Sequence, residues 1–259
     1  MSAFDEDTSA IDQEKDNVLF KKLRKLINLI DQLRDCGVQN YIQLPRIASL
    51  GTQSSVMKKM TFEAFIKANA QVVEEIRHIA WNLHESVGQT YDNNLPYGHH
   101  LSMVADAAIK YGYEVVNNES DIIPVVFAAY FHDSIEDARL TYNDVVSIAG
   151  RFMTNEQTIT AAEVVYALTN DKGRSRNERA GEHYYAGIRE TPYAPFVKLC
   201  DRLANMTYSF NGTNDANNHM HKVYASEWSH FLQAITVSNH DSRYSLPASM
   251  VTEVQSLFA

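Results

Sequence analysis

The chain has 259 residues, is 45% hydrophobic and 10% aromatic, and carries a formal net charge of −9. These values exclude collagen-like, low-complexity and wholly disordered chains, and they leave enough apolar side chains for one core. An acidic chain is also a poor nonspecific binder of nucleic acid or of an anionic membrane, so neither is expected as a partner.

Cysteine content and hydropathy indicate in which cellular compartment the protein is expected. Cys36 and Cys200 are too few and too far apart for a disulfide framework. No apolar run approaches the roughly 18–20 residues that a membrane span needs, and the acidic start is unlike a signal peptide. We therefore expect a cytoplasmic protein in a reducing compartment. The sequence leaves homo-oligomerisation open.

The first 56 residues are expected to form a leader. Residues 1–16 hold six acidic side chains and one lysine, a net of −5, so the other 243 residues carry only −4. Apolar residues at three- and four-residue steps predict an amphipathic helix over 18–33. A short strand over 42–50 is expected to run into a turn at Gly51.

Residues 18–55 have a second feature, since their order of motifs up to Gly51-Thr-Gln-Ser-Ser resembles the start of a dynamin-superfamily GTPase. The phosphate-binding loop of such proteins needs G-x-x-x-x-G-K-[ST]. Here the second glycine and the correctly placed lysine are missing after Ser55. Residues 1–56 are therefore predicted not to act as a GTPase, and residues 57–259 to form a separate domain.

From about residue 57 the pattern predicts an all-α domain of eight to ten helices. A first helix is expected over 61–85, with Thr61 as its N-cap, followed by a polar loop over 88–97. Helical periodicity then recurs over 99–112, 121–134, 141–151, 155–168, 176–190, 193–209, 219–236 and 247–257. Asp121, Thr141 and Thr154 are the expected N-caps of three of these helices.

A group of ionisable side chains follows the most apolar of these helices. Residues 131–137 are Phe-His-Asp-Ser-Ile-Glu-Asp. In a helix, His132 would lie one turn from Glu136, and Asp133 one turn from Asp137. Such groups at the end of a buried helix are costly unless something compensates them, and a divalent cation would do so. The alternative is a solvated helix end with a chance histidine.

Two other segments strengthen the metal interpretation. His99 and His100 open the helix after the polar loop, and Asp201 lies within an apolar helix. Taken alone, a single aspartate in such a helix is more often capped or paired than bound to metal. Together with His132 and Asp133, however, these segments supply two histidines and two aspartates, a set suited to Mn²⁺ or Fe²⁺ and unlike a cysteine-rich zinc site.

The order of these segments resembles the HD phosphohydrolase superfamily and, more narrowly, the hydrolase domain of RelA/SpoT homologues and the small alarmone hydrolases. The matching stretches are Pro-Tyr-Gly-His-His at 96–100, His-Asp-Ser-Ile-Glu-Asp at 132–137 and Lys-Leu-Cys-Asp-Arg-Leu-Ala-Asn at 198–205. Leu-Thr-Asn-Asp-Lys at 168–172, followed by Glu-Arg at 178–179, matches a further segment. The resemblance covers about residues 62–235 and implies an all-α HD-domain helical fold with an N-terminal extension.

The resemblance implies a metal-dependent 3′-pyrophosphohydrolase of nucleotide alarmones, (p)ppGpp or (p)ppApp, that releases pyrophosphate. Glu136 and Asp137 would position and deprotonate the attacking water, whose pKa the cation lowers. His100 is preferred to His99 as a ligand because it precedes Val104 by four residues, as the family's His-Pro-x-x-Val requires. One Mn²⁺ ion would then be held by His100, His132, Asp133 and Asp201.

The same resemblance predicts the substrate contacts. Asn205 resembles the family's ribose contact. Lys172 and Arg179 belong to a basic cluster and are expected to bind phosphate. Lys198 is expected either to contact the substrate or to pair with Asp201.

The chain departs from the family in the loop before Pro96. The family typically has Gln-x-Arg-Lys there, and its basic residues help to hold the guanine base and the phosphates. In this chain Tyr91 and Asp92 replace them. An ionised aspartate only accepts hydrogen bonds, which suits the exocyclic amine of adenine, while a tyrosine ring could stack on either base. We expect relaxed or adenine-leaning selectivity; the alternative is that another residue recognises the base.

Two other functions stay open at this point. Another HD-type phosphohydrolase, acting on nucleoside monophosphates or NADPH, would release orthophosphate instead of pyrophosphate. A non-catalytic nucleotide-binding module would have no need of the adjacent Glu136 and Asp137.

Overall fold

The computed structural model describes residues 49–92, 95–170, 174–212, 214–238 and 241–258. The structure divides after Leu50, and the helices that build the site all belong to the unit from Gly51 to Ala259. The predictions for residues 1–48, which include the acidic segment, the helix over 18–33 and most of the GTPase-like segment, lie outside the described residues. Within the described part, no helix is both long enough and apolar enough to cross a membrane.

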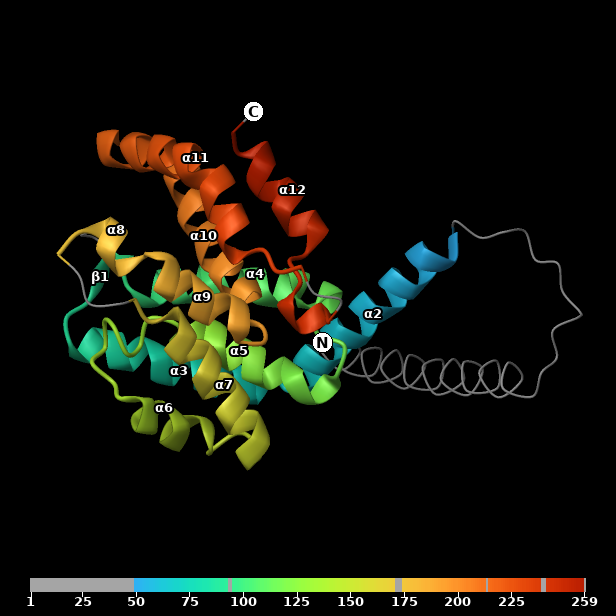
Figure 1. Ribbon diagram of the computed structural model, residues 1–259. Coiled ribbons are helices and arrows are strands. Elements are labelled where there is room, and N and C mark those ends of the chain that lie inside the picture. The colour runs from blue at the N-terminus through green and yellow to red at the C-terminus, as the bar shows by residue number, and fades with distance from the viewer. Residues whose placement is uncertain (1–48, 93–94, 171–173, 213, 239–240, 259) are drawn as a thin grey trace, which may run out of the picture. The chain divides into compact units, whose positions relative to one another are not determined.

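The described part is all-α apart from one short hairpin, which confirms the predicted fold class (Figure 1). The hairpin consists of β1 (Thr90–Tyr91) and β2 (Leu95–Pro96), which pair antiparallel with Tyr91 opposite Leu95. It lies within the predicted polar loop. The α-helices are α2 (Ser49–Ala68), α3 (Ala70–Ser86), α4 (Gly98–Tyr111), α5 (Ile122–Phe131), α6 (Tyr142–Ala149), α7 (Asn155–Leu168), α8 (Arg176–Arg179), α9 (Glu182–Glu190), α10 (Ala194–Asn211), α11 (Asp215–Ile235) and α12 (Ala248–Ser256), and three short 3₁₀ segments are η1 (Gly112–Glu114), η2 (Glu119–Asp121) and η3 (Ser242–Tyr244).

Two predicted helices are each divided into two. The helix expected over 61–85 is broken at Asn69, whose side-chain Nδ2 donates to the carbonyl of Phe65 at 2.8 Å. An asparagine side chain that bonds the backbone in this way competes with helix propagation. The helix expected over 176–190 is broken at Gly181, which has extended backbone angles and caps α9.

Two predictions near the start of the domain are wrong. Thr61 is not an N-cap, because α2 begins at Ser49 and the Thr61 hydroxyl donates to the carbonyl of Met57 within the helix. Gly51 is not in a turn, because it also lies inside α2. The predicted boundary between residues 56 and 57 falls within the same helix, and the division into leader and hydrolase domain stays a prediction.

Helix α5 lies at the centre of the domain. All ten of its residues are buried, because its sequence Ile-Ile-Pro-Val-Val-Phe-Ala-Ala-Tyr-Phe is apolar on every side. A helix without a polar face must be covered all round. It packs against α3, α4, α7 and α10, and Figure 1 shows it between α4 and α7. The residues that follow α5 therefore start from a fixed position in the core.

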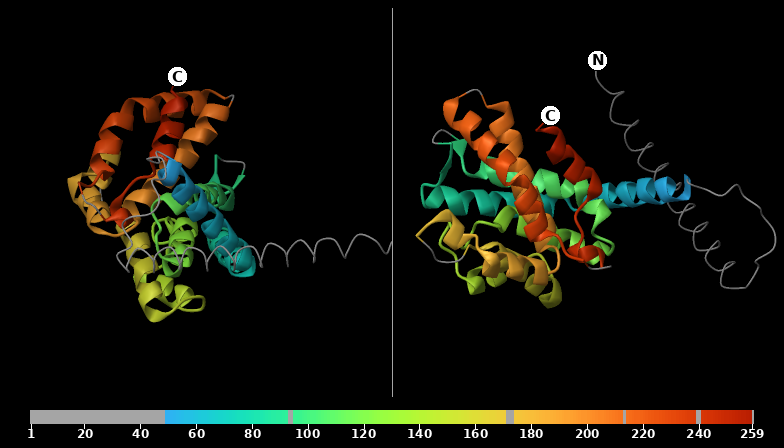
Figure 2. Two further views of the ribbon diagram at one scale, coloured as in Figure 1. Left: turned by 90° about the vertical axis from the view of Figure 1, so that its right-hand side faces the viewer. Right: turned by 45° about the horizontal axis from the view of Figure 1, so that its top comes forward.

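Helix α10 completes the framework around the site. It packs against α4 and against α11, and the right view of Figure 2 shows α11 alongside it. Eleven of its eighteen residues are buried. The start of α4, the end of α5 and the middle of α10 can thus present polar side chains to one shared region.

The predicted N-caps differ in what their side chains do. Thr141 and Thr154 are confirmed, and each forms a capping box with the residue three positions later, Asp144 and Gln157. Asp121 occupies the N-cap position of α5 without a capping hydrogen bond. Its carboxylate instead accepts a hydrogen bond from the Tyr193 hydroxyl at 2.6 Å.

We expect Thr154→Ala to lower the free energy of unfolding by about 1 kcal/mol, because the first turn of α7 loses its capping box. Thr160→Ala is the matched control in the same helix, since its hydroxyl only bonds the Glu156 carbonyl one turn back and alanine favours helix. Urea unfolding measures both variants. Equal losses in the two would contradict a capping role for Thr154.

Candidate active site

The segment His132–Asp137 forms a series of turns directly after α5. The helix ends at Phe131, three residues before the predicted end, so the expectation that His132 is helical is wrong. The backbone N–H of Asp137 nevertheless donates to the carbonyl of Asp133 at 2.8 Å. These two carboxylates therefore remain one turn apart, as predicted.

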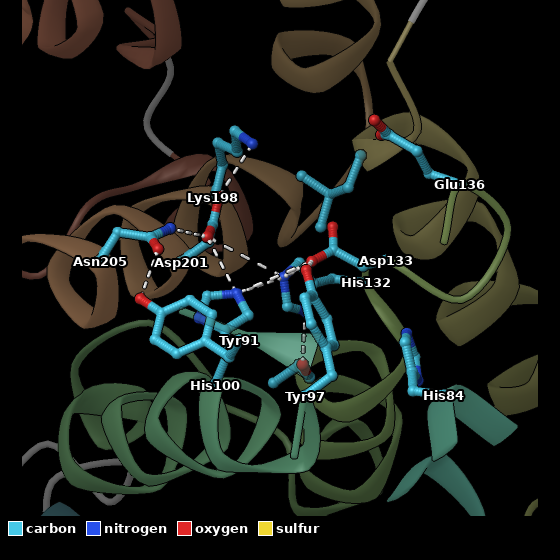
Figure 3. A network of polar contacts seen from close by, with 12 residues as sticks. His84, Tyr91, Tyr97, His100, His132, Asp133, Glu136, Lys198, Asp201 and Asn205 are labelled. Carbon is cyan, nitrogen blue, oxygen red and sulfur yellow. Dashed lines mark hydrogen bonds and ion pairs between the residues drawn. The ribbon is translucent and has the colours of Figure 1, made fainter. Parts of the chain in front are cut away.

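The four predicted metal ligands come together from three parts of the chain (Figure 3). The Nε2 atoms of His100 and His132 are 3.3 Å apart. Asp133 Oδ2 lies 2.9 Å from the His132 Nε2 and 3.7 Å from the His100 Nε2. Asp201 Oδ1 lies 3.4 Å and 3.9 Å from the Nε2 atoms of His100 and His132. The neighbouring His99 is exposed, so the geometry favours His100 of the two adjacent histidines.

The spacing of these donor atoms fits a shared divalent cation. The ligand atoms of His100, His132 and Asp133 all lie within 4.8 Å of one another, and Asp201 extends the group through its contacts with both imidazoles. Donors about 2.1 Å from one cation are about 3.0–3.4 Å apart in octahedral or tetrahedral geometry. The site could therefore hold a divalent metal ion with two nitrogen and two oxygen ligands.

The charges of the cluster compensate one another within the protein. Burial alone would lower the pKa of His132, but the carboxylates of Asp133 and Asp201 raise it to about 9. Burial alone would raise the pKa of Asp133, but His132 holds it well below its usual range. The pKa of Asp201 is also lowered against the effect of burial, mainly by Lys198. The carboxylates thus stay ionised and available as ligands.

The Asp133 carboxylate is supported by two side chains, Tyr97 and His84, that were not among the predicted site residues. The Tyr97 hydroxyl donates to Asp133 Oδ2 at 2.5 Å. His84 stacks on the Tyr97 ring with centroids 4.9 Å apart and an interplanar angle of 12°. Tyr97 belongs to the matching Pro-Tyr motif, which could have pointed to it. His84, wholly buried near the end of α3, has no comparable signal in the sequence.

The predicted acid–base pair is split by the structure. Glu136 is exposed, and its carboxylate accepts hydrogen bonds from the Asn170 Nδ2 at 2.9 and 3.0 Å. Figure 3 shows it directed away from the imidazoles. Asp137 is partly buried, and its pKa is raised first by burial and then by the charge of Asp133. Of the two, Asp137 is the better placed to exchange protons near the cluster.

A pocket of about 310 Å³ opens beside Asp201. The predicted contacts Arg179, Lys198 and Asn205 all line it. Lys198 also pairs with Asp201, its Nζ lying 3.0 Å from Oδ2. Lys172 lies outside the described residues.

Part of the pocket lining comes from a helix that was not predicted to belong to the site. Helix α11 contributes Tyr224, Glu227, His230 and Phe231 to the lining. Residues 224, 227 and 231 recur at helical spacing on one face, a pattern that could have indicated a shared surface. Arg202 joins this wall to α10, because its guanidinium lies 3.1 Å from the Glu227 carboxylate and 4.3 Å from the Phe231 ring centroid.

The hairpin places Tyr91 against His100 of the cluster, and neither Tyr91 nor Asp92 lines this pocket. The Tyr91 hydroxyl donates to Asn205 Oδ1 at 3.0 Å. Asp92 has a left-handed backbone conformation with φ of 50°, which aspartate tolerates better than most residues. Its Oδ2 accepts a hydrogen bond from the Tyr208 hydroxyl at 2.8 Å.

An all-α domain in which a histidine, a His-Asp pair and a later aspartate converge has the arrangement of an HD-type hydrolase. No family model matches the chain. It is 26% identical over 141 residues, 54% of this chain and 69% of the relative, to the guanosine-3′,5′-bis(diphosphate) 3′-pyrophosphohydrolase MESH1 of Danio rerio. This similarity confirms the predicted resemblance to the small alarmone hydrolases. A solved structure of a metazoan orthologue of SpoT, described as hydrolysing ppGpp, matches with a TM-score of 0.48 and 18% identity over 72% of this chain and 95% of that chain.

We expect the affinity of the metal-free protein for Mn²⁺ to rise with pH. His132 has a pKa of about 9, so it is protonated at neutral pH and must release its proton to become a ligand. Because this pKa of the His132 imidazole lies above the pH range of about 6.5 to 8.5, the affinity for Mn²⁺ should rise about tenfold per pH unit across that range.

Calorimetric titration under argon measures this effect. Buffers of different ionisation enthalpy report about one proton released per ion. Binding that is independent of pH and releases no proton would contradict the assigned state of His132.

Proposed function

We propose that the chain is a metal-dependent 3′-pyrophosphohydrolase of nucleotide alarmones that uses one Mn²⁺ ion. The observation that carries this proposal is the convergence of His100, His132, Asp133 and Asp201 beside a pocket with basic side chains. A set of imidazole and carboxylate donors without thiolate suits Mn²⁺. The similarity to a relative named for hydrolysis of guanosine-3′,5′-bis(diphosphate) supports ppGpp as a substrate.

A cation held by these four side chains supplies Lewis acidity, which lowers the pKa of water and offsets the negative charge on the reacting phosphoryl group. Asp137 accepts the proton of the attacking water. Its raised pKa suits that task, because a base with a pKa nearer the working pH can also return the proton. Water attacks the phosphorus atom that is bonded to the 3′ oxygen. The bond between this phosphorus and the 3′ oxygen breaks, the 3′ oxygen takes up a proton from Asp137, and pyrophosphate leaves.

The basic side chains of the pocket bind the phosphates. Burial alone would lower the pKa of Lys198, but Asp201 raises it well above its ordinary value, so the ammonium stays charged. Arg179 lines the same pocket and can bind phosphate oxygens through two parallel hydrogen bonds. Glu136 acts at the rim by holding Asn170, another lining residue. Lys172 keeps its predicted role as a phosphate contact.

The remaining predictions concern the cellular location and the binding partners of the protein. We propose a cytoplasmic location and a small-molecule nucleotide partner, and we propose no nucleic acid or membrane partner.

We expect purified protein with Mn²⁺ to release pyrophosphate from ppGpp. Asp133→Ala should abolish turnover, and Asp137→Asn should lower kcat about 10²–10⁴-fold, because the proton acceptor is lost. Glu136→Gln keeps a side-chain oxygen for Asn170 and should cost less than tenfold in kcat. Equal losses in the Asp137 and Glu136 variants would contradict the split of roles.

A substrate panel separates this function from the alternatives. The panel contains ppGpp, pppGpp, ppApp, NADPH and a nucleoside monophosphate, each assayed for pyrophosphate and orthophosphate. Release of orthophosphate from NADPH or from the monophosphate, without release of pyrophosphate from ppGpp, pppGpp or ppApp, would favour a general HD-type phosphatase. Binding of ppGpp without any product would favour a nucleotide-binding module.

We propose adenine-leaning selectivity, with Asp92 accepting from the exocyclic amine. A carboxylate offers about four lone-pair sites, so it can accept this bond in addition to the one from Tyr208. Asp92→Lys should shift the ratio of kcat/KM for ppGpp over ppApp about tenfold or more toward guanine. Asp92→Asn, which both donates and accepts, is the matched control and should shift it less. An unchanged ratio in Asp92→Lys would exclude Asp92 as a base contact.

A further inference from the structure

His100 lacks the hydrogen bond that usually orients a metal-binding histidine. Its side chain is 2% exposed, and its Nδ1 has no hydrogen-bond partner among the described residues. His132 differs, because its Nδ1 bonds the carbonyl of Ala129 at 2.9 Å. In metal sites the second ring nitrogen normally donates to a carboxylate or carbonyl, which fixes the ring. The His100 ring must therefore be held in another way.

Two tyrosine rings pack against the His100 imidazole. Tyr91 stacks on it with centroids 5.0 Å apart and an interplanar angle of 17°. Tyr97 meets it edge-on at 5.5 Å and 65°. The Tyr91 ring is itself held by Tyr208, which contacts it edge-on at 4.7 Å. These contacts restrict rotation of the imidazole about its Cβ–Cγ bond.

The hydroxyl of Tyr91 connects the same residue to a second predicted ligand. It donates to Asn205 Oδ1 at 3.0 Å, and Asn205 Nδ2 donates to Asp201 Oδ1 at 2.6 Å. That carboxylate oxygen faces the His100 Nε2 at 3.4 Å. Tyr91, Asn205, Asp201 and His100 thus form a closed ring of contacts, which Figure 3 shows.

We propose that Tyr91 is a positioning residue of the metal centre, which orients His100 through its ring and Asp201 through Asn205. Both ends of the Asn205 amide are engaged in this ring of contacts. Asn205 accordingly serves to transmit the constraint to Asp201, in addition to any contact with ribose. The inference rests on the proposed function only where it concerns catalysis. The effect of Tyr91 on the metal ligands can be measured as Mn²⁺ affinity, without turnover.

The test is titration of the metal-free protein with Mn²⁺, with free Mn²⁺ followed by electron paramagnetic resonance. Tyr91→Leu removes ring and hydroxyl and should weaken binding about 10–100-fold, as loss of supporting contacts typically does. Tyr91→Phe keeps the stacked ring and should weaken it about 2–10-fold through the lost hydrogen bond. Tyr166→Leu is the control and should leave affinity unchanged, because Tyr166 is an exposed tyrosine on α7 whose ring contacts Tyr142.

A second readout separates positioning from contact with the nucleobase. At saturating Mn²⁺, a positioning role predicts a KM for ppGpp within about threefold of wild type for Tyr91→Phe. A KM raised tenfold or more in both Tyr91 variants, with Mn²⁺ affinity unchanged, would overturn the proposal. If Tyr91→Leu has lost its helical circular dichroism, Tyr91→Phe decides the question.

Failure of the proposed function gives a different result. Wild-type protein that binds Mn²⁺ but hydrolyses no nucleotide would refute the hydrolase assignment. The affinities of the Tyr91 variants would still support or overturn the positioning role.

Discussion

The structure depends on mutual compensation of charge inside an apolar core. His100 and His132 are each 2% exposed, and two carboxylates lie against them. An isolated buried carboxylate is so costly that it normally takes up a proton. Here each acid has a cationic or hydrogen-bonding partner, and the pKa of His132 rises to about 9 in return. Removing one partner would leave the others uncompensated, which makes the cluster a unit.

This unit exists because helices with different surfaces meet around it. Helix α5 is apolar throughout, so it is enclosed by its neighbours and its C-terminal end lies deep in the domain. The polar segment after it cannot reach solvent as a whole, and α4 and α10 supply the missing partners. The negative end of α5 favours positive charge at the same place. Burial of α5 and assembly of the site are therefore two consequences of one packing arrangement.

The sequence predicts most of this arrangement because its signals are local. Helix α7 has the predicted bounds, since Thr154 and the periodicity after it lie within one segment. The convergence of the four predicted ligands, His100, His132, Asp133 and Asp201, was also predictable from motif order. The contact between Tyr91 and Asn205 was not, because 114 positions separate them and neither residue marks the other. The break at Asn69 likewise depends on whether its side chain bonds the backbone, which composition does not reveal.

Local pairing also explains why the net charge of −9 says little about the site. Lys198 lies 3.0 Å from Asp201, and Arg202 lies 3.1 Å from Glu227, so two basic side chains of the pocket are already matched by carboxylates. Charges farther away than about 8–10 Å are largely screened at physiological ionic strength. A polyanionic nucleotide bound there, as we propose, would therefore respond to the few charges lining the pocket. Under the proposed function, a divalent ion and the guanidinium of Arg179 would add local positive charge beyond that of the matched Lys198 and Arg202. The proposed function therefore implies that substrate binding and metal binding would be coupled through electrostatics, even where they share no side chain.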